Sequence, residues 1–261
     1  MPSEQAPAVQ VDRLSKRYFL RGGRAQELKA ALLSLPRLLR NGRQGHDFWA
    51  LRDISFTLSR GECLGVAGPN GSGKSTLLRI LARITRPTSG QITTNGRVSA
   101  LLELGAGFEP QISGRENALL NAVLLGLSLK EARAVLPEIV AFSELGDFIE
   151  QPMRTYSSGM FVRLGFAVAV HVRPEILLVD EVLAVGDAEF QSKCFAHMQR
   201  LREDGVTIIF ASHDLPSLQR YTDRVMLLEQ GRTVLEGTPA EVVHAYLARV
   251  FGPASRTGEQ A

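Results

Sequence analysis

Nine consecutive residues, 68–76, have the types and spacing of a loop that binds phosphate. They satisfy the pattern G-x-x-x-x-G-K-[ST] and read Gly68-Pro69-Asn70-Gly71-Ser72-Gly73-Lys74-Ser75-Thr76. Glycines let backbone N–H groups turn toward the phosphates, above the positive end of a helix dipole. Lys74 would reach the β- and γ-phosphates, and the Ser75 hydroxyl would bind Mg²⁺. A glycine-rich surface turn is the alternative, but an apolar strand before the loop and a helix pattern after it favour nucleoside triphosphate binding.

Acidic residues follow a second apolar strand pattern, at the positions Asp180 and Glu181. Ligands of an open parallel sheet lie beyond the carboxyl ends of its strands, so Asp180 is expected near the Mg²⁺ ion. Glu181 is placed to orient and deprotonate the attacking water. His213 follows another apolar strand and could contact the γ-phosphate, although a helix-capping role is the alternative. A solvated turn is the alternative for the two acids.

A run of small residues opens a helix pattern at positions 157–160. It consists of Ser157, Ser158, Gly159 and Met160. Small residues at a helix N-terminus can bind an anion, although Ser-Ser-Gly is also a common helix start. Its place upstream of the acidic pair strengthens the first interpretation.

Strand and helix patterns alternate around these motifs, which predicts an α/β fold with a parallel core sheet. The expected strands are 9–14, 50–58, 63–67, 175–179, 206–211 and a hairpin that starts at 225 and turns at 230–231. A helical block at about 113–172 predicts a separate helical subdomain, with Pro137 dividing its first part into at least two helices. Capping-box patterns start helices after Ser113 and Thr238.

Composition indicates an ordinary globular protein with one basic segment. The chain has 261 residues, 44% hydrophobic and 22% charged, with a net charge of +3. Nine Lys or Arg and one Glu lie between Arg13 and Arg43, so that this segment carries +8 and the remainder −5. No run is long enough for a membrane span, and we find no secretion signal. Cys63 and Cys194 are expected to be buried thiols in a cytoplasmic protein.

The basic segment contains an amphipathic helix pattern within an insertion at about 20–47. Leucines recur at helical spacing, lysine and arginine lie on the opposite side, and Pro36 would bend the helix. The apolar side could meet protein or acyl chains, and the basic side could meet lipid headgroups or a diphosphate. A helix merely packed on the domain, with a solvated basic face, is the alternative.

Together these motifs resemble the ATP-binding subunits of ABC transporters, over residues 1–251. Residues 68–76 correspond to Walker A, 176–181 to Walker B and 157–160 to the signature motif. The resemblance implies ATP and Mg²⁺ as cofactors. It also implies a P-loop NTPase core with a mixed sheet, an N-terminal antiparallel β subdomain and an inserted helical subdomain.

Three further residues gain expected roles from the resemblance alone. Tyr18 looks like the aromatic residue that stacks on adenine, Asp187 like the D-loop aspartate, and His213 like the switch histidine. In this family a homodimer encloses two ATP molecules, so the signature residues and Asp187 would act in trans. Closure and opening would drive a separate permease in the membrane, from its cytoplasmic side.

Departures from the usual family pattern indicate a subfamily. The signature reads YSSGM, Glu103 stands where a Q-loop glutamine and possible Mg²⁺ ligand is usual, and about thirty residues separate Tyr18 from Phe48. With phrases such as LLELGAGFEP and DEVLAVGD, these features resemble the exporters of lipid-linked polysaccharides. The insertion resembles their gate helix, near an anionic membrane surface or the glycan. Residues 252–261 are expected to be a disordered tail, with no C-terminal carbohydrate-binding domain.

Two alternatives remain open at this stage. The first is an ABC exporter of another cargo, such as a drug or a lipid. The second is a soluble ABC ATPase that acts on nucleic acid through its basic segment. No nucleic-acid partner is expected, because such proteins usually carry paired ATPase units or long coiled coils, and neither pattern is present.

Overall fold

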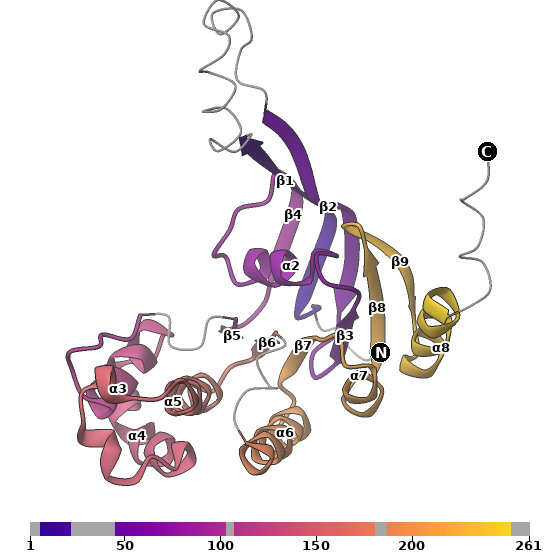
Figure 1. Ribbon diagram of the computed structural model, residues 1–261. Helices are drawn as coiled ribbons and strands as arrows, with labels where there is room; N and C mark the ends of the chain where they lie inside the picture. The colour runs from indigo at the N-terminus through magenta and orange to yellow at the C-terminus, as the bar shows by residue number, and fades with distance from the viewer. Residues whose placement is uncertain (1–5, 22–44, 103–106, 181–186, 252–261) are drawn as a thin grey trace, which may run out of the picture.

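Two β-sheets form the centre of the molecule (Figure 1). The computed structural model describes residues 6–21, 45–102, 107–180 and 187–251. The first sheet is antiparallel, with the order β2-β1-β4, and comprises β1 (Val9–Arg21), β2 (Gly45–Leu58) and β4 (Ser89–Thr94).

The second sheet has the order β5-β6-β7-β3-β8-β9. Its strands are β3 (Cys63–Ala67), β5 (Val98–Leu101), β6 (Ile176–Val179), β7 (Thr207–Ala211), β8 (Arg224–Glu229) and β9 (Arg232–Gly237). The pairings from β5 to β8 are parallel, and β9 returns antiparallel to β8. The expected α/β fold with a mixed sheet and an antiparallel β subdomain is thus confirmed.

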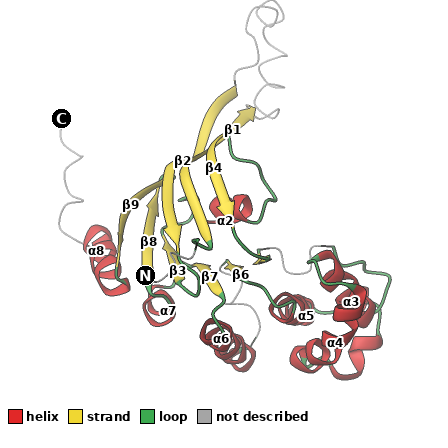
Figure 2. Ribbon diagram, turned by 180° about the vertical axis from the view of Figure 1, so that it is seen from behind, coloured by secondary structure: helices red, strands yellow, loops and turns green. Residues whose placement is uncertain are grey.

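Helices cover both faces of the second sheet (Figure 2). Helix α2 (Lys74–Leu81) lies between the sheets, where Leu77 and Leu81 pack with Leu58 and Ile176 in one buried cluster. The opposite face carries a second cluster, built with α6 (Ala188–Glu203), α7 (Leu215–Tyr221) and α8 (Pro239–Phe251). Strands β3, β6 and β7 are buried along their whole length, as their continuous apolar sequences indicated.

A helical lobe stands to one side of the sheets. It contains α3 (Gly114–Leu124), α4 (Leu129–Ser143), α5 (Ser158–His171) and the short 3-10 helices η1 (Gly146–Glu150) and η2 (Met153–Thr155). A third apolar cluster holds it together, with Ala132 and Ile139 of α4 packed among buried residues of α5. The lobe agrees with the helical block that the sequence predicts.

The predicted effect of Pro137 was wrong. Pro137 lies inside the continuous helix α4, and the break falls earlier, between α3 and α4. Gly126 has a φ of 101°, and Ser128 starts α4 with a capping box that includes Glu131. Because Pro137 faces solvent, the carbonyl that loses its helical donor can meet water.

Other element predictions hold in part. The capping boxes at Ser113 and Thr238 are both present. Strands β4 and β5 were missed, and β1 and β2 extend beyond the predicted ends into the insertion assigned to residues 20–47. Residues 22–44, which hold the amphipathic pattern, lie outside the described residues, as does the tail 252–261.

The two cysteines and a pair of histidines lie among apolar side chains and not in reactive sites. Cys63 and Cys194 are buried free thiols, and burial raises the pKa of each to about 12. His171 of α5 and His197 of α6 lie with ring centroids 5.0 Å apart, and both contact the ring of Phe142. His171 Nδ1 donates to the Ala167 carbonyl. Burial lowers the pKa of His171 and, together with His171 itself, lowers the pKa of His197 to about 4.

We expect this histidine pair to make stability depend on pH. The folded state keeps His197 neutral, whereas the unfolded chain binds a proton near its ordinary pKa of 6.5. The stabilisation is therefore complete above about pH 6.5 and lost as the pH falls toward 4. Melting temperatures of the wild type and His197→Gln, measured over this range at constant ionic strength, should differ in slope. Parallel slopes would contradict the assignment to His197.

Candidate nucleotide-binding site

The phosphate loop, residues 68–76, joins β3 to α2 in a conformation that needs glycine. Gly68 and Gly73 have φ values of 149° and 113°. A Cβ atom on Gly68 would lie 2.2 Å from the Leu228 carbonyl oxygen, and one on Gly73 would lie 2.6 Å from that of Ala50. Gly71 has a φ of 79° with nothing within 4 Å of its missing Cβ. The loop backbone is thus fixed at its ends by close packing and open at its tip.

Lys74 lies at the N-terminus of α2 and is 5% exposed. Its Nζ donates to the carbonyl oxygens of Gly68 at 2.8 Å and Pro69 at 3.2 Å. The ammonium group is therefore positioned against the loop, where phosphate oxygens can replace carbonyls as acceptors. A cleft of about 210 Å³ lies over the loop, lined by Phe48, Ala50, Asn70, Gly71, Gly73, Lys74, Ser75 and Thr76.

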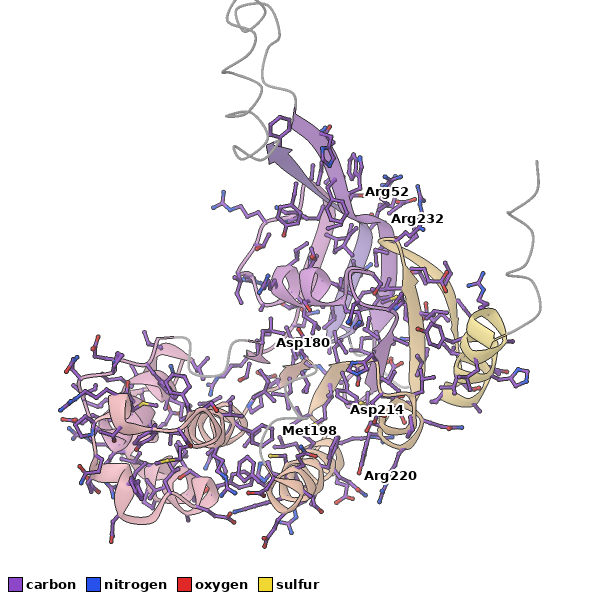
Figure 3. The ribbon with its side chains drawn as sticks, in the orientation of Figure 1. Arg52, Asp180, Met198, Asp214, Arg220 and Arg232 are labelled. Carbon is purple, nitrogen blue, oxygen red and sulfur yellow. The ribbon has the colours of Figure 1, made fainter. Side chains whose placement is uncertain are left out.

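Asp180, labelled in Figure 3, and the phosphate loop follow strands that end at the same edge of the sheet. Val179 of β6 pairs with Phe210 of β7, and Val66 of β3 pairs with Ala211, so that the three strands end together. Asp180 follows β6 and is half-buried, while Ser75 lines the cleft. A hydroxyl and a carboxylate are oxygen ligands of the kind Mg²⁺ takes beside phosphates and water. These two residues fit the predicted metal role.

Two predicted residues of this edge, Glu181 and Glu103, lie outside the described residues. His213 is described and follows β7 at the same edge, exposed to solvent. Its neighbour Asp214 caps α7 by accepting from the Ser217 N–H, and Ser212 Oγ accepts from the Asp214 N–H. Because these neighbours carry out the capping, the histidine ring is not needed for it.

The signature residues begin α5, as the sequence predicts. The Ser157 hydroxyl accepts from the Met160 N–H, and helix α5 then starts at Ser158. A Cβ atom added to Gly159 would have the Ser157 hydroxyl oxygen, 3.9 Å away, as its nearest neighbour. Within the described chain, packing therefore gives no reason for glycine at 159. The residues that line the cleft over the phosphate loop include none from α5.

Asp187 is the N-cap of α6 and links it to α5. One carboxylate oxygen accepts from the Phe190 N–H at 2.9 Å, and the other accepts from Arg163 at 2.5 Å. Both bonds lower the pKa of Asp187, the backbone one first. Arg163 also pairs with Glu144 at 3.2 Å, and Lys193 of α6 pairs with the same Glu144. We name these four residues the lobe–α6 network.

An aromatic side chain other than Tyr18 lines the cleft. Tyr18 on β1 pairs with Phe48 on β2, and it is Phe48, 45% exposed, that contributes to the cleft over the phosphate loop. Lys16 Nζ lies 4.9 Å from the centre of the Tyr18 ring. The predicted stacking role of Tyr18 stays a prediction, and Phe48 becomes a second candidate for contact with the base.

Sequence reasoning missed Asn117, which supports the loop before α3, and named Tyr156 only as part of the signature motif. Buried Asn117 accepts from the Glu109 N–H and donates to the carbonyls of Glu109, Ile112 and Ser113. The Tyr156 hydroxyl donates to the Phe148 carbonyl and occupies the space that a Cβ on Gly114 would need. The signal that could have revealed Asn117 is its place as a polar residue on the apolar side of the helix pattern.

A sequence profile described as ABC transporter matches residues 51–184, which include the phosphate loop and Asp180. The chain belongs to the ABC transporter family. An O-antigen export system ATP-binding protein of Myxococcus xanthus is 50% identical over 81% of this chain and 49% of its own length. One of Klebsiella pneumoniae is 47% identical over 78% of this chain and 82% of its own.

A teichoic acids export ATP-binding protein of Lactococcus lactis is 41% identical over 91% of this ABC chain and 50% of its own length. The chain thus spans about half the length of several curated relatives that it matches. Solved structures share the fold. A dimeric post-hydrolysis ATP-binding cassette bound to ADP and phosphate has a TM-score of 0.70 at 21% identity, over 88% of this chain and 98% of that one.

We expect the lobe–α6 network to be needed for turnover of this ABC chain but not for ATP binding. Arg163→Gln removes the charge that joins Asp187 to Glu144, so Asp187 loses one of the two hydrogen bonds that position it. Misplacement of this kind typically costs about ten- to a hundredfold in rate. Phosphate release and binding of a fluorescent ATP analogue should be measured for this variant and for Arg154→Gln, an exposed control. Equal turnover in both variants would remove the network from the mechanism.

Proposed function

We propose that this chain is the ATP-hydrolysing subunit of an ABC exporter of lipid-linked polysaccharide, and that it works as a homodimer. The observation that carries the proposal is the division of the nucleotide site. Lys74 and Ser75 line the cleft over the phosphate loop, and Asp180 follows β6 at the same edge of the sheet. The signature residues 157–160 begin a helix that does not line that cleft. A second copy can supply the missing helix end.

Helix α5 has the properties that such a contact needs. Its first turn presents backbone N–H groups, and Gly159 leaves space in front of them. The γ-phosphate of an ATP bound to one copy would attract this positive helix end of the other copy, and hydrolysis would remove that attraction. The dimeric cassette with ADP and phosphate is a relative in fold that supports this assembly. We assign Ser157, Ser158, Gly159, Met160 and Asp187 to this contact in trans.

We further propose catalytic roles at the sheet edge. Glu181, next to Asp180, would accept the proton of the attacking water, and His213 would contact the γ-phosphate. Mg²⁺, bound by Ser75 and Asp180, would neutralise phosphate charge. Glu103 is a further candidate ligand from the segment before α3. ATP would be bound by residues 68–76, with Tyr18 or Phe48 against the base.

The helical lobe offers a surface for a membrane permease. Apolar side chains are exposed along α3 and at the start of α4, and Leu124 is the most exposed of them at 72%. The others are Leu120, Val123 and Leu129. None of these four residues lines the cleft over the phosphate loop, and an exposed apolar set of this kind favours a protein contact. No helix among the described residues is long and apolar enough to cross a membrane. On the family resemblance, we assign the transmembrane path to separate permease subunits, with this chain on the cytoplasmic side.

The cargo is proposed from the relatives. Proteins named for the export of O antigen and of teichoic acids share between 37% and 50% identity with this chain. The domain assignment, an ATP-binding domain over 1–251 with a basic insertion at 20–47, is part of the proposal. The insertion would face the anionic membrane surface or the glycan carrier.

The catalytic proposal predicts that Glu181→Gln binds ATP and dimerises but hydrolyses it slowly. Removal of a general base typically lowers the rate by about 10²- to 10⁴-fold. Phosphate release gives the rate, and light scattering with Mg-ATP gives the mass of the complex. Glu175→Gln, an exposed acid outside the cleft, is the control. Turnover at the wild-type rate would exclude Glu181 as the base.

The cargo proposal predicts that cells without this protein accumulate lipid-linked polymer inside. Immunoblots of fractionated cells should detect the polymer on the cytoplasmic side, and a plasmid copy should restore export. A plasmid copy with Lys74→Ala should fail to restore it, because the phosphate loop loses its ammonium group. Normal export in the deletion strain would favour another cargo.

A further inference from the structure

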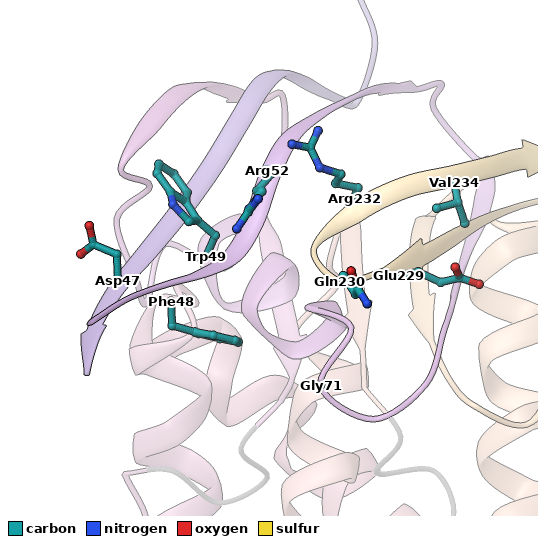
Figure 4. Close-up of a pocket in the computed structure, with 9 residues that line it drawn as sticks. All are labelled: Asp47, Phe48, Trp49, Arg52, Gly71, Glu229, Gln230, Arg232 and Val234. Carbon is teal, nitrogen blue, oxygen red and sulfur yellow. The ribbon is translucent and has the colours of Figure 1, made fainter. Parts of the chain in front are cut away.

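A second groove lies beside the phosphate loop, between β2 and the β8–β9 hairpin (Figure 4). We call it the arginine groove and define it by Asp47, Trp49, Arg52, Glu229, Gln230 and Arg232. Its volume is about 570 Å³, in the range of small-molecule sites. Gly71 and Phe48 line both this groove and the cleft over the phosphate loop. The groove is thus distinct from the nucleotide cleft but shares a wall with it.

Two arginines and two carboxylates line the groove, but within the described chain only the carboxylates have ion-pair partners. Its acids are already engaged, since Asp47 pairs with Arg17 at 3.0 Å and Glu229 with Arg249 at 3.6 Å. Arg52 and Arg232 have no carboxylate partner among the described residues, and they lie close together in Figure 4. Arg17 and Arg249 lie outside the lining and balance the two carboxylates, so Arg52 and Arg232 leave an unbalanced charge of +2.

Trp49 orders these arginines. The guanidinium carbons of Arg17 and Arg52 lie 5.6 and 5.9 Å from the centre of its ring. A guanidinium that lies against an indole ring keeps its N–H edge available for phosphate or carboxylate oxygens. Arg232 lines the groove from another strand, so the guanidinium groups of Arg52 and Arg232 can both donate hydrogen bonds to one ligand.

We propose that the arginine groove binds a pyrophosphate group carried by a larger molecule. Two linked phosphates offer one acceptor group to Arg52 and one to Arg232, and the remaining volume accommodates the rest of the ligand. A nucleoside diphosphate sugar and a polyprenyl pyrophosphate share this group. The proposal does not depend on the transport function.

The groove is connected to the phosphate loop through backbone hydrogen bonds. The Arg52 N–H donates to the Gly231 carbonyl at 2.7 Å, and the Gly231 N–H donates to the Ser72 carbonyl at 2.9 Å. A ligand bound through Arg52 would therefore stabilise the segment that supports the loop. By linkage, it would raise the affinity for ATP, and ATP would raise the affinity for it.

The groove contains its own probe, because Trp49 is the single tryptophan of the chain. Inorganic pyrophosphate should be titrated into the intact protein while Trp49 fluorescence is recorded, with sulfate at equal ionic strength as a control. Lys74→Ala separates this site from the phosphate loop. We expect saturable binding in the wild type and in Lys74→Ala, and binding weakened about tenfold or more in Arg52→Gln and in Arg232→Gln.

Arg220→Gln is the matched control, since it removes the same charge from α7, at the far end of the molecule from the groove (Figure 3). Equal weakening by this variant would overturn the proposal, as would loss of binding in Lys74→Ala or a sulfate titration with the same signal. Binding of the fluorescent ATP analogue by both groove variants would establish that they fold. It would also separate a failure of the groove from a failure of the ATPase assignment.

Two larger probes identify the source of the pyrophosphate group. Uridine diphosphate N-acetylglucosamine and farnesyl pyrophosphate in detergent should be compared by the same titration. Tighter binding of either one than of inorganic pyrophosphate supports the proposal and assigns the remainder of the ligand. Weaker binding of both would contradict a site for a group carried by a larger molecule.

Discussion

The geometry of the nucleotide site depends on backbone contacts that hold the phosphate loop from outside. Gly231 of the β8–β9 turn donates to Ser72 and accepts from Arg52. A Cβ on Gly231 would lie 2.7 Å from the Ala50 carbonyl oxygen, the same atom that excludes a side chain at Gly73. Strand β2, the hairpin and the loop therefore pack at backbone distance, so their positions are coupled. Lys74 can point into the loop because its backbone is fixed in this way.

The two sheets and the lobe divide the chemistry between them. Parallel strands β3, β6 and β7 end in one row, which brings Ser75, Asp180 and His213 to one edge. The lobe instead carries the start of α5, held by the Ser157 cap and by Tyr156 against Gly114. In the assembly that we propose, a second copy would complete the nucleotide site, and hydrolysis would then depend on contact between copies.

Much of this arrangement could be predicted from sequence, because the decisive signals are local. The phosphate loop, the acidic strand end and the Ser157 cap each depend on a few adjacent residues. The predicted break at Pro137 is absent because Pro137 lies on the exposed face of α4. Tertiary packing decides which face of a helix is exposed, so the local sequence did not indicate it. Strands β4 and β5 were both missed. Strand β4 is largely exposed and pairs with β1, which is distant in the sequence. Phe48 and Arg163 depend on tertiary neighbours, which no local pattern specifies.

The lobe–α6 network has a mechanical consequence. Glu144 at the end of α4, Arg163 in α5, and Asp187 and Lys193 in α6 are joined by three ion pairs. Helix α6 follows directly from the segment after Asp180, so the lobe is linked to the core through charge as well as through the chain. A displacement of the exposed leucines of α3 would be passed to α6 through these ion pairs as well as through the apolar packing of the lobe. In the function that we propose, the lobe would thus couple a partner bound at α3 to the segment that follows Asp180.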